Sequence, residues 1–193
     1  MHICCANCAM FPLKALGEGG HEITGLWFNP NIHPEDEYER RLNAVRELEV
    51  KRGLEVIKRG VYGLEDFNRE VEAAGRGSER PDRCRVCYRM RMRETALECS
   101  RGGFDAFTTS LLVSPYQAHD LLVSEAMKAA AEFGVSFHYG DFRPGWREGQ
   151  SLSRDAGFYR QYYCGCHYSR SERDAERSGR RIEGTASAGQ GTQ

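Results

Sequence analysis

The sequence has no long apolar run, because charged residues interrupt its 193 residues well before the about 18 apolar positions that a membrane span needs. It also lacks a basic segment followed by an apolar one near its start, which is the pattern of a secretory signal. We therefore expect a cytoplasmic protein with no membrane partner. The sequence contains no internal repeat and no G-x-G-x-x-G or Walker loop, so no motif indicates a nucleotide phosphate site.

Lysine is scarce, with 4 lysines against 23 arginines, and the net charge is only −1. That balance hides an asymmetry, since residues 1–75 carry a charge of −4 and residues 76–193 a charge of +3. The planar guanidinium of arginine binds phosphate and stacks on bases, so the basic second half favours a nucleic-acid partner. A GC-rich genome explains the excess of arginine over lysine equally well.

Apolar periodicity predicts helices separated by short strands. We expect strands at residues 1–4, 22–28, 54–58, 104–111 and 135–139, and helices at residues 9–17, 35–52, 64–74, 84–99, 114–133, 147–156 and 169–177. Strands that alternate with helices predict an α/β fold with a mainly parallel sheet. The first expected strand is unusually short, which leaves open where the natural chain starts.

The chain is long enough for one domain with a core, which we expect over residues 1–177. Residues 178–193 contain Ile182 as their one large apolar side chain, so we expect them to form a disordered tail.

Cysteine is abundant for a cytoplasmic chain, with eight residues. Seven of them form three groups: Cys4, Cys5 and Cys8; Cys84 and Cys87; and Cys164 and Cys166. Cys99 stands alone on an expected helix, and we interpret it as a buried structural thiol. Stable disulfides are disfavoured in the cytoplasm, so the three groups indicate metal binding or redox chemistry.

The spacing of the groups restricts the kind of metal site. A C-x-x-C pair directs two thiolates at one centre, which suits a tetrahedral zinc ion or an iron–sulfur cluster. The adjacent residues Cys4 and Cys5 make a poor zinc knuckle, and seven thiols exceed the four that zinc needs. Cys164 and Cys166 flank Gly165 and suit either a strained, reactive disulfide or further metal ligation. A structural zinc domain is the simpler alternative. The first cysteine group is expected at the carboxyl end of the first strand, which is where α/β sheets bind ligands.

Four segments occur in the order "HICCANC", "RCRVCYRMRMRETA", "FTTSLLVSPYQ" and "GFYRQYYCGCHYS". Together they resemble the cobalamin-independent epoxyqueuosine reductases, the QueH family, over roughly residues 1–170. The family's pattern often has proline at the position of Asn7, and cysteine or aspartate at that of Cys8. The resemblance implies a Rossmann-like layered domain related to nucleotide α-hydrolase folds, to which a helical, cysteine-bearing portion is added.

The same resemblance implies an oxidoreductase of queuosine biosynthesis that reduces epoxyqueuosine to queuosine at the tRNA wobble position, with electrons from a donor still to be identified. It implies a [4Fe-4S] cluster on Cys4, Cys5, Cys84 and Cys87. It gives the catalytic pair Cys164 and Cys166 either a redox-active disulfide or a second iron, which Cys8 would help to bind.

Removing the epoxide oxygen as water takes two electrons and two protons, and an iron–sulfur cluster delivers one electron at a time. A second redox centre, either another metal or a dithiol, is therefore useful. A metal with an open coordination position also acts as a Lewis acid on the epoxide oxygen. Tyr159, Tyr163 and His167 flank the last cysteine group and are candidate proton donors, although core packing explains each tyrosine equally well.

Basic and aromatic residues near the cysteines indicate how tRNA is bound. We expect Arg143, Tyr159, Arg160 and Tyr163 to contact the substrate, and an arginine-rich stretch to follow its phosphates. That stretch consists of Arg76, Arg80, Arg83, Arg85, Arg89, Arg91 and Arg93. A solvated helix face is the alternative for any single arginine. Asn29 and Asn31 are expected near the pocket, and His2 in the core.

Two other functions fit the same residues. A tRNA sulfur transferase would use this fold, but would normally need ATP and a phosphate loop after the first strand. A zinc-binding RNA module would not be an enzyme. It would contain zinc alone, whereas the reductase would contain iron and acid-labile sulfide.

Overall fold

The computed structural model describes the backbone of residues 1–75 and 79–188, and the side chains of that part as far as Ser178. The helices are α1 (Ala6–Glu18), α2 (Glu35–Arg52), α3 (Leu64–Ala73), α4 (Asp82–Gly102), α5 (His119–Phe133), α6 (Trp146–Asp155) and α7 (His167–Ala188). The strands are β1 (Gly25–Trp27), β2 (Val56–Lys58), β3 (Ala106–Phe107) and β4 (Ser136–Phe137). Two short 3-10 helices, η1 (Ser110–Val113) and η2 (Arg143–Gly145), complete the elements.

The strands pair in parallel, as the alternation of strands and helices predicts. β1 pairs with β2, and β3 with β4. His2 joins these pairs, because it bridges Leu26 on one side and Thr109 on the other, both in parallel. The amide of Ile3 donates to the Leu26 carbonyl at 2.8 Å, and that of His2 to the Thr108 carbonyl at 2.8 Å. The order across the molecule is therefore β2, β1, residues 1–3, β3 and β4.

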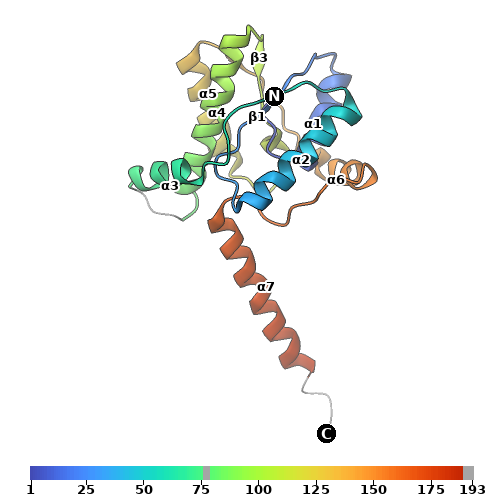
Figure 1. The fold of residues 1–193 in the computed structure, drawn as a ribbon, viewed down its shortest axis with the longest axis vertical. Coiled ribbons are helices and arrows are strands. Elements are labelled where there is room, and N and C mark those ends of the chain that lie inside the picture. Colours follow the sequence, from blue (N-terminus) through green and yellow to red (C-terminus); the bar gives the residue numbers. More distant parts are fainter. Residues whose placement is uncertain (76–78, 189–193) are drawn as a thin grey trace.

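Helices cover both sides of these short strands, and Figure 1 shows α4 and α5 on one side and α2 and α6 on the other. Trp27 of β1 is fully buried with α2 residues such as Val45 and Leu48 in one apolar cluster. A second cluster joins α4 and α5 through Met92 and Leu122, both fully buried. Burying each such side chain contributes about 1.5–3 kcal/mol, so the two clusters hold the central strands from opposite faces.

The strand centre is tightly packed at Gly25. A Cβ atom there would lie 2.7 Å from the Ile3 side chain and 2.9 Å from that of Val56. Only glycine allows the three neighbouring segments to approach this closely, so Gly25 fixes the position of residues 1–3 and of Cys4 behind them.

The expected helix at residues 35–52 is confirmed at both ends. It stops at Gly53, which has φ +61° and whose amide donates to the Glu49 carbonyl. That left-handed conformation favours glycine. The helices expected at residues 64–74, 84–99 and 147–156 also form, with ends shifted by one to three residues.

The expected strand over residues 104–111 is wrong in length. β3 ends at Phe107, and the Thr109 hydroxyl then accepts the Leu111 amide at 3.2 Å, which turns the chain into η1. The helix expected from Ser114 starts only at His119, because the Ser114 hydroxyl accepts the Tyr116 amide in a turn. The first expected strand is likewise reduced to the bridge at His2.

The last helix, α7, extends away from the remainder of the molecule (Figure 1). It starts at His167, directly after the third cysteine group, and its backbone includes the first part of the expected tail. Residues 189–193 lie outside the described part, so the disordered tail and the domain boundary at residue 177 stay predictions. Among the helices described, none combines the length and apolar character needed to cross a membrane.

Candidate metal centre

Cys4, Cys5 and Cys8 lie at the carboxyl end of the central strand segment, where residues 1–3 lead into α1. The expected helix start at Ala9 is wrong, because the Cys5 sulfur accepts the Cys8 amide at 3.3 Å and so caps α1 at Ala6. The Cys4 amide donates to the Ser110 hydroxyl at 3.1 Å. The three sulfur atoms lie within 4.8 Å of one another, and all three residues are buried. In the described part of the chain, this triad is the one compact group of potential metal ligands.

Burial and mutual hydrogen bonds give the three thiols of the triad different pKa values. Hydrogen bonds from the Cys5 and Cys8 thiols hold the pKa of Cys4 well below its usual range. Burial raises the pKa of Cys5 to about 12, and the hydrogen bonds to Cys4 and Cys5 raise that of Cys8. A thiolate that accepts from two neighbouring thiols is a site where a metal ion can replace the two protons.

The other two cysteine motifs meet at a small cavity lined by Cys84, Cys87, Cys164 and Cys166. Cys84 and Cys87 are one turn apart on α4 and therefore share a face of that helix. Burial raises the pKa of Cys84 to about 11 and raises that of Cys87 further. The protein thus brings together four thiols from segments about 80 residues apart in the sequence.

The loop with Cys164 and Cys166 is held by Arg41 of α2. Arg41 and Glu37 are both buried, and the Arg41 Nε donates to the Glu37 carboxylate at 2.7 Å. The same guanidinium donates to the Cys164 carbonyl at 3.0 Å and to the Tyr163 carbonyl at 3.1 Å. Gly165 has φ +136°, and a Cβ atom there would lie 3.1 Å from Arg41 Nη1. A buried ion pair therefore positions the third cysteine group against the second.

Two glutamine side chains contact sulfur atoms, and sequence reasoning missed both. Gln161 donates to the Cys5 sulfur at 2.7 Å, and Gln117 approaches the Cys164 sulfur at 3.6 Å. Gln117 is oriented by Tyr88, whose hydroxyl donates to its amide oxygen at 2.7 Å. Both glutamines lie inside motif segments, "SPYQ" and "FYRQYYCGC", which was the available signal.

The two tyrosines expected near the substrate use their hydroxyls within the protein. Tyr159 donates to the Glu37 carboxylate at 2.5 Å, and burial raises its pKa to about 12. Tyr163 is buried, donates to the His33 carbonyl and has a raised pKa, also because of burial. Both contacts support the loop that carries Cys164, as the packing alternative predicts. Burial lowers the pKa of His167, the third candidate proton donor.

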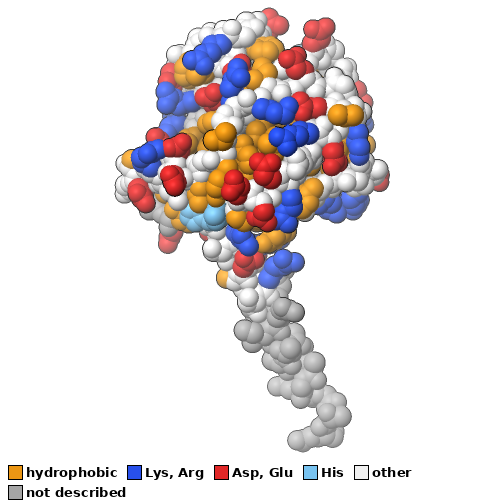
Figure 2. Space-filling model, in the orientation of Figure 1, with side chains coloured by type: hydrophobic (Ala, Val, Ile, Leu, Met, Phe, Trp, Pro, Cys, Tyr) orange, Lys and Arg blue, Asp and Glu red, His pale blue; other side chains and the backbone are white. Residues whose placement is uncertain are grey.

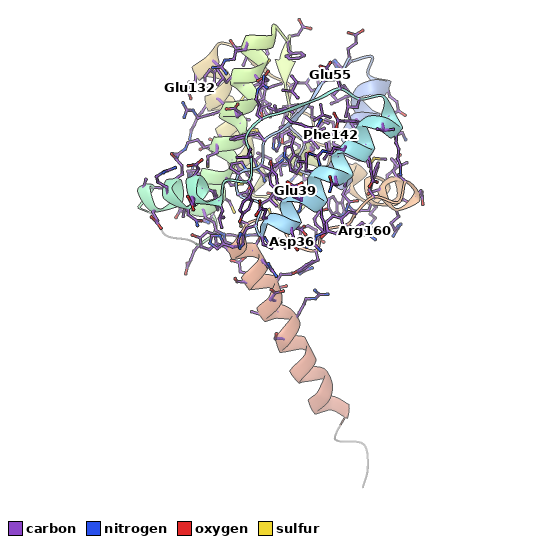
Figure 3. The ribbon with its side chains drawn as sticks, viewed as in Figure 1. Asp36, Glu39, Glu55, Glu132, Phe142 and Arg160 are labelled. Atoms are coloured by element: carbon purple, nitrogen blue, oxygen red, sulfur yellow. The ribbon has the colours of Figure 1, made fainter. Side chains whose placement is uncertain are left out.

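The arginines expected to follow phosphate are divided between surface and interior. Arg160 lies at the surface beside α6 (Figure 3), where it donates to the Gln150 side chain at 3.4 Å. Arg143 forms a two-point contact with Asp141 at 2.7 and 2.8 Å. Four arginines of the stretch after residue 76 pair with carboxylates of other elements: Arg83, Arg85, Arg89 and Arg93. Arg76 lies outside the described residues. Acidic and basic side chains alternate on the face seen in Figure 2.

Two arginines of the same stretch differ from the others. Arg80 lines the four-cysteine cavity and makes no ion pair among the described residues. Arg91 is buried and donates to the Asn31 side-chain oxygen, which also lines that cavity. The expected place of Asn31 is therefore confirmed.

Further expectations concern the single residues His2, Asn29 and Cys99. His2 is fully buried between the Thr109 hydroxyl and the Phe28 carbonyl, as a core residue should be. Asn29 donates to the Ile3 carbonyl at 2.9 Å. Cys99 is buried in the apolar cluster of α4 and α5, as expected.

All eight cysteines are free thiols in this structure, so the disulfide between Cys164 and Cys166, one of the two roles that the sequence left open for this pair, is not present in it. The two thiols face the same cavity as reduced groups.

A larger cavity, of about 550 Å³, lies at the opposite, amino end of the strands. It is lined by residues such as Met1, Thr24 and Asp105, and holds none of the seven motif cysteines. The concentration of thiols, amides and buried arginine at the carboxyl end therefore identifies the candidate site, although its cavity is smaller.

A parallel α/β core with a buried cysteine triad and a four-cysteine cavity at one end defines a cysteine-rich protein of the metal-binding or redox class. Comparison with known proteins is more specific, because the family model for the epoxyqueuosine reductase QueH matches residues 1–172. The chain belongs to this QueH family.

Curated relatives support the assignment, and each is named epoxyqueuosine reductase QueH. The protein from Dehalococcoides mccartyi is 38% identical over 173 residues, which cover 90% of this chain and 92% of the relative. The protein from Thermotoga maritima is 32% identical over 192 residues, or 94% of this chain and 96% of the relative. The protein from Streptococcus pyogenes is 32% identical over 88% of this chain and 69% of the relative.

Proposed function

We propose that this protein reduces epoxyqueuosine to queuosine at the wobble position of tRNA. The reaction takes two electrons and two protons, and the epoxide oxygen leaves as water. The observation that carries the proposal is that the three cysteine motifs form a buried triad and a four-cysteine cavity at the carboxyl end of the strands, in a chain of the QueH family. A single structural zinc ion would leave three of these seven thiols without a use.

We infer that the thiols hold a [4Fe-4S] cluster, and the residues present fit such a group. Thiolates are the ligands that iron–sulfur clusters require, and their burial protects the cluster from solvent. Arg91 Nε is buried without a hydrogen-bond partner among the described residues, which suits an anionic group beside it. Cys4 and Cys5 from the triad, with Cys84 and Cys87 from α4, are the proposed ligands. When bound, the cluster supplies single electrons to the site.

We propose that Cys8, Cys164 and Cys166 provide the second redox centre, either by binding a second iron or as a dithiol that oxidises to a disulfide. Arg41 keeps the Cys164 loop in place, and the amides of Gln117 and Gln161 donate toward sulfur. Hydrogen bonds to a thiolate favour its charged form. Each amide can therefore remain a donor to its sulfur once metal binding has displaced the thiol proton.

We propose that the layering is Rossmann-like, as in nucleotide α-hydrolases. If residues 1–3 are counted as the first strand, the order of the five segments in space is third, second, first, fourth, fifth. This is the order of a doubly wound sheet, which binds ligands at the carboxyl ends of its strands near the point of reversal. Cys4 immediately follows the first of these segments, where the order reverses.

We propose that tRNA approaches the four-cysteine cavity, with Arg80 as a contact for phosphate because it lines that cavity and forms no ion pair with a carboxylate of the described residues. Arg143 and Arg160 are proposed as peripheral phosphate contacts, and Arg143 would have to leave Asp141 to act so. Tyr159 and Tyr163 act on the substrate through the loop that they support. The eight free thiols suit a reducing compartment, so we place the reaction in the cytoplasm.

The function is tested by single turnover with anaerobically reconstituted protein, a chemical reductant and tRNA that carries epoxyqueuosine. Nucleosides from the digested tRNA are then separated by mass. We expect conversion to queuosine, a loss of 16 mass units (about one oxygen atom), which Cys84→Ser abolishes and Cys99→Ser retains. Zinc without iron, and no conversion, would favour the RNA-binding module, whereas ATP-dependent sulfur incorporation would favour the transferase.

A further inference from the structure

Three arginines are buried among the described residues, and they differ in their counter-charges. Arg41 pairs with Glu37, and Arg83 pairs with Glu172. Arg91, which is only 1% exposed, pairs with no described carboxylate. Its Nη2 donates to the neutral side chain of Asn31, and its Nε has no partner among the described residues. A buried guanidinium that lacks a counter-charge is costly, so a nearby anion must stabilise it.

Among the described residues, the groups that can become anionic and that act on Arg91 are thiols. They belong to Cys87, Cys4 and Cys164, one from each of the three cysteine motifs. Cys87 precedes Arg91 by one turn of α4, so both side chains lie on the same face of the helix. Arg91 is therefore close enough to interact electrostatically with a thiol from each cysteine motif.

We propose that Arg91 is the internal counter-charge of the thiolate-bound cluster and raises its reduction potential. This inference rests on the proposed function, because it needs a cluster at this site. Reduction adds one negative charge, and a fixed positive charge in a low-dielectric interior stabilises the reduced form more than the oxidised form. Arg91 is a positioning and tuning residue, since it acts through the cluster and not on the substrate.

The test is a redox titration of the reconstituted protein, in which absorption and electron paramagnetic resonance spectra monitor the reduction of the cluster. Arg91→Gln should lower the equilibrium constant for cluster reduction at least tenfold, or 59 mV for a one-electron couple. Arg91→Lys keeps the positive charge, so its reduction potential should fall by less than half of the fall seen with Arg91→Gln. Arg89→Gln on the same helix removes an exposed arginine paired with Glu70, and should leave the potential unchanged.

A second variant covers the case in which Arg91→Gln fails to fold. Asn31→Asp places a carboxylate at the atom that already accepts from Arg91, and so neutralises the arginine without removing it. The reduction potential should again fall, and the equilibrium constant for cluster reduction should be at least tenfold lower. Equal shifts for the glutamine and lysine variants, or no shift with Asn31→Asp, would overturn the inference alone. A wild-type protein that takes up no cluster after reconstitution would instead overturn the proposed function.

Discussion

Replacing Arg41 should destabilise the whole protein and release the Cys164 loop. Arg41 and Glu37 are each 2% exposed at their side chains, and breaking a buried pair of this kind by removing one partner costs about 3–5 kcal/mol. The loss includes the two hydrogen bonds that Arg41 donates to the Tyr163 and Cys164 carbonyls. We expect Arg41→Gln to lower the free energy of unfolding by that amount, measured by urea unfolding under reducing conditions.

The matched control is Arg40→Gln, one residue earlier on the same helix. Arg40 is half-exposed and pairs mainly with Asp36, so its loss should cost less than about 1 kcal/mol. The double variant of Arg41→Gln and Glu37→Gln should recover about 1–3 kcal/mol, because no buried charge is left unpaired. A cost below 1 kcal/mol for Arg41→Gln, or a double variant as unstable as the sum of the two single variants, would refute the reasoning.

Three further changes test separate parts of the structure. Gly165→Ala should lower the free energy of unfolding by about 1–3 kcal/mol, since its φ is +136° and the added methyl group meets Arg41. The control is Gly157→Ala, at φ +73° in open space, which should cost about 1 kcal/mol. Equal urea midpoints for the two variants would contradict this. Cys99→Ala should lower stability by about 1–2 kcal/mol without changing metal content; loss of iron would refute a purely structural role. Arg143 lowers the pKa of Asp141 to about 2, so Arg143→Gln should return this pKa toward 3.8 in a carboxyl NMR titration. The stabilisation from the pair is present above pH 4 and should fade as the pH falls toward 2. An unchanged pKa of Asp141 in the variant would contradict the contact.

Sequence reasoning found the elements that local physics determines. The helix at residues 35–52 has acidic residues in its first turn and Gly53 at its end, and both ends were predicted correctly. The strands were predicted too long, because the apolar runs at residues 22–28 and 104–111 continue beyond the residues that pair. The turn into η1 depends on the Thr109 hydroxyl, a contact that periodicity does not detect.

For the site, the cysteine motifs indicated the chemistry but not how the motifs are grouped. The compact triad includes Cys8, whereas Cys84 and Cys87 share their cavity with Cys164 and Cys166. This arrangement depends on tertiary contacts, above all on Arg41, which lies more than 100 residues before the loop that it holds. Buried arginines also cannot be separated from surface arginines by composition, so the sequence alone places Arg91 in a stretch expected to bind phosphate.

The most direct test of the account is the metal content of protein purified without oxygen. Iron, zinc and acid-labile sulfide are measured per chain, together with the absorption spectrum before and after reduction. We predict about four irons and four sulfides per chain, absorption that bleaches on reduction, and one additional iron if Cys8, Cys164 and Cys166 bind metal. One zinc per chain with no sulfide, even after anaerobic reconstitution, would contradict the cluster and the proposed reduction.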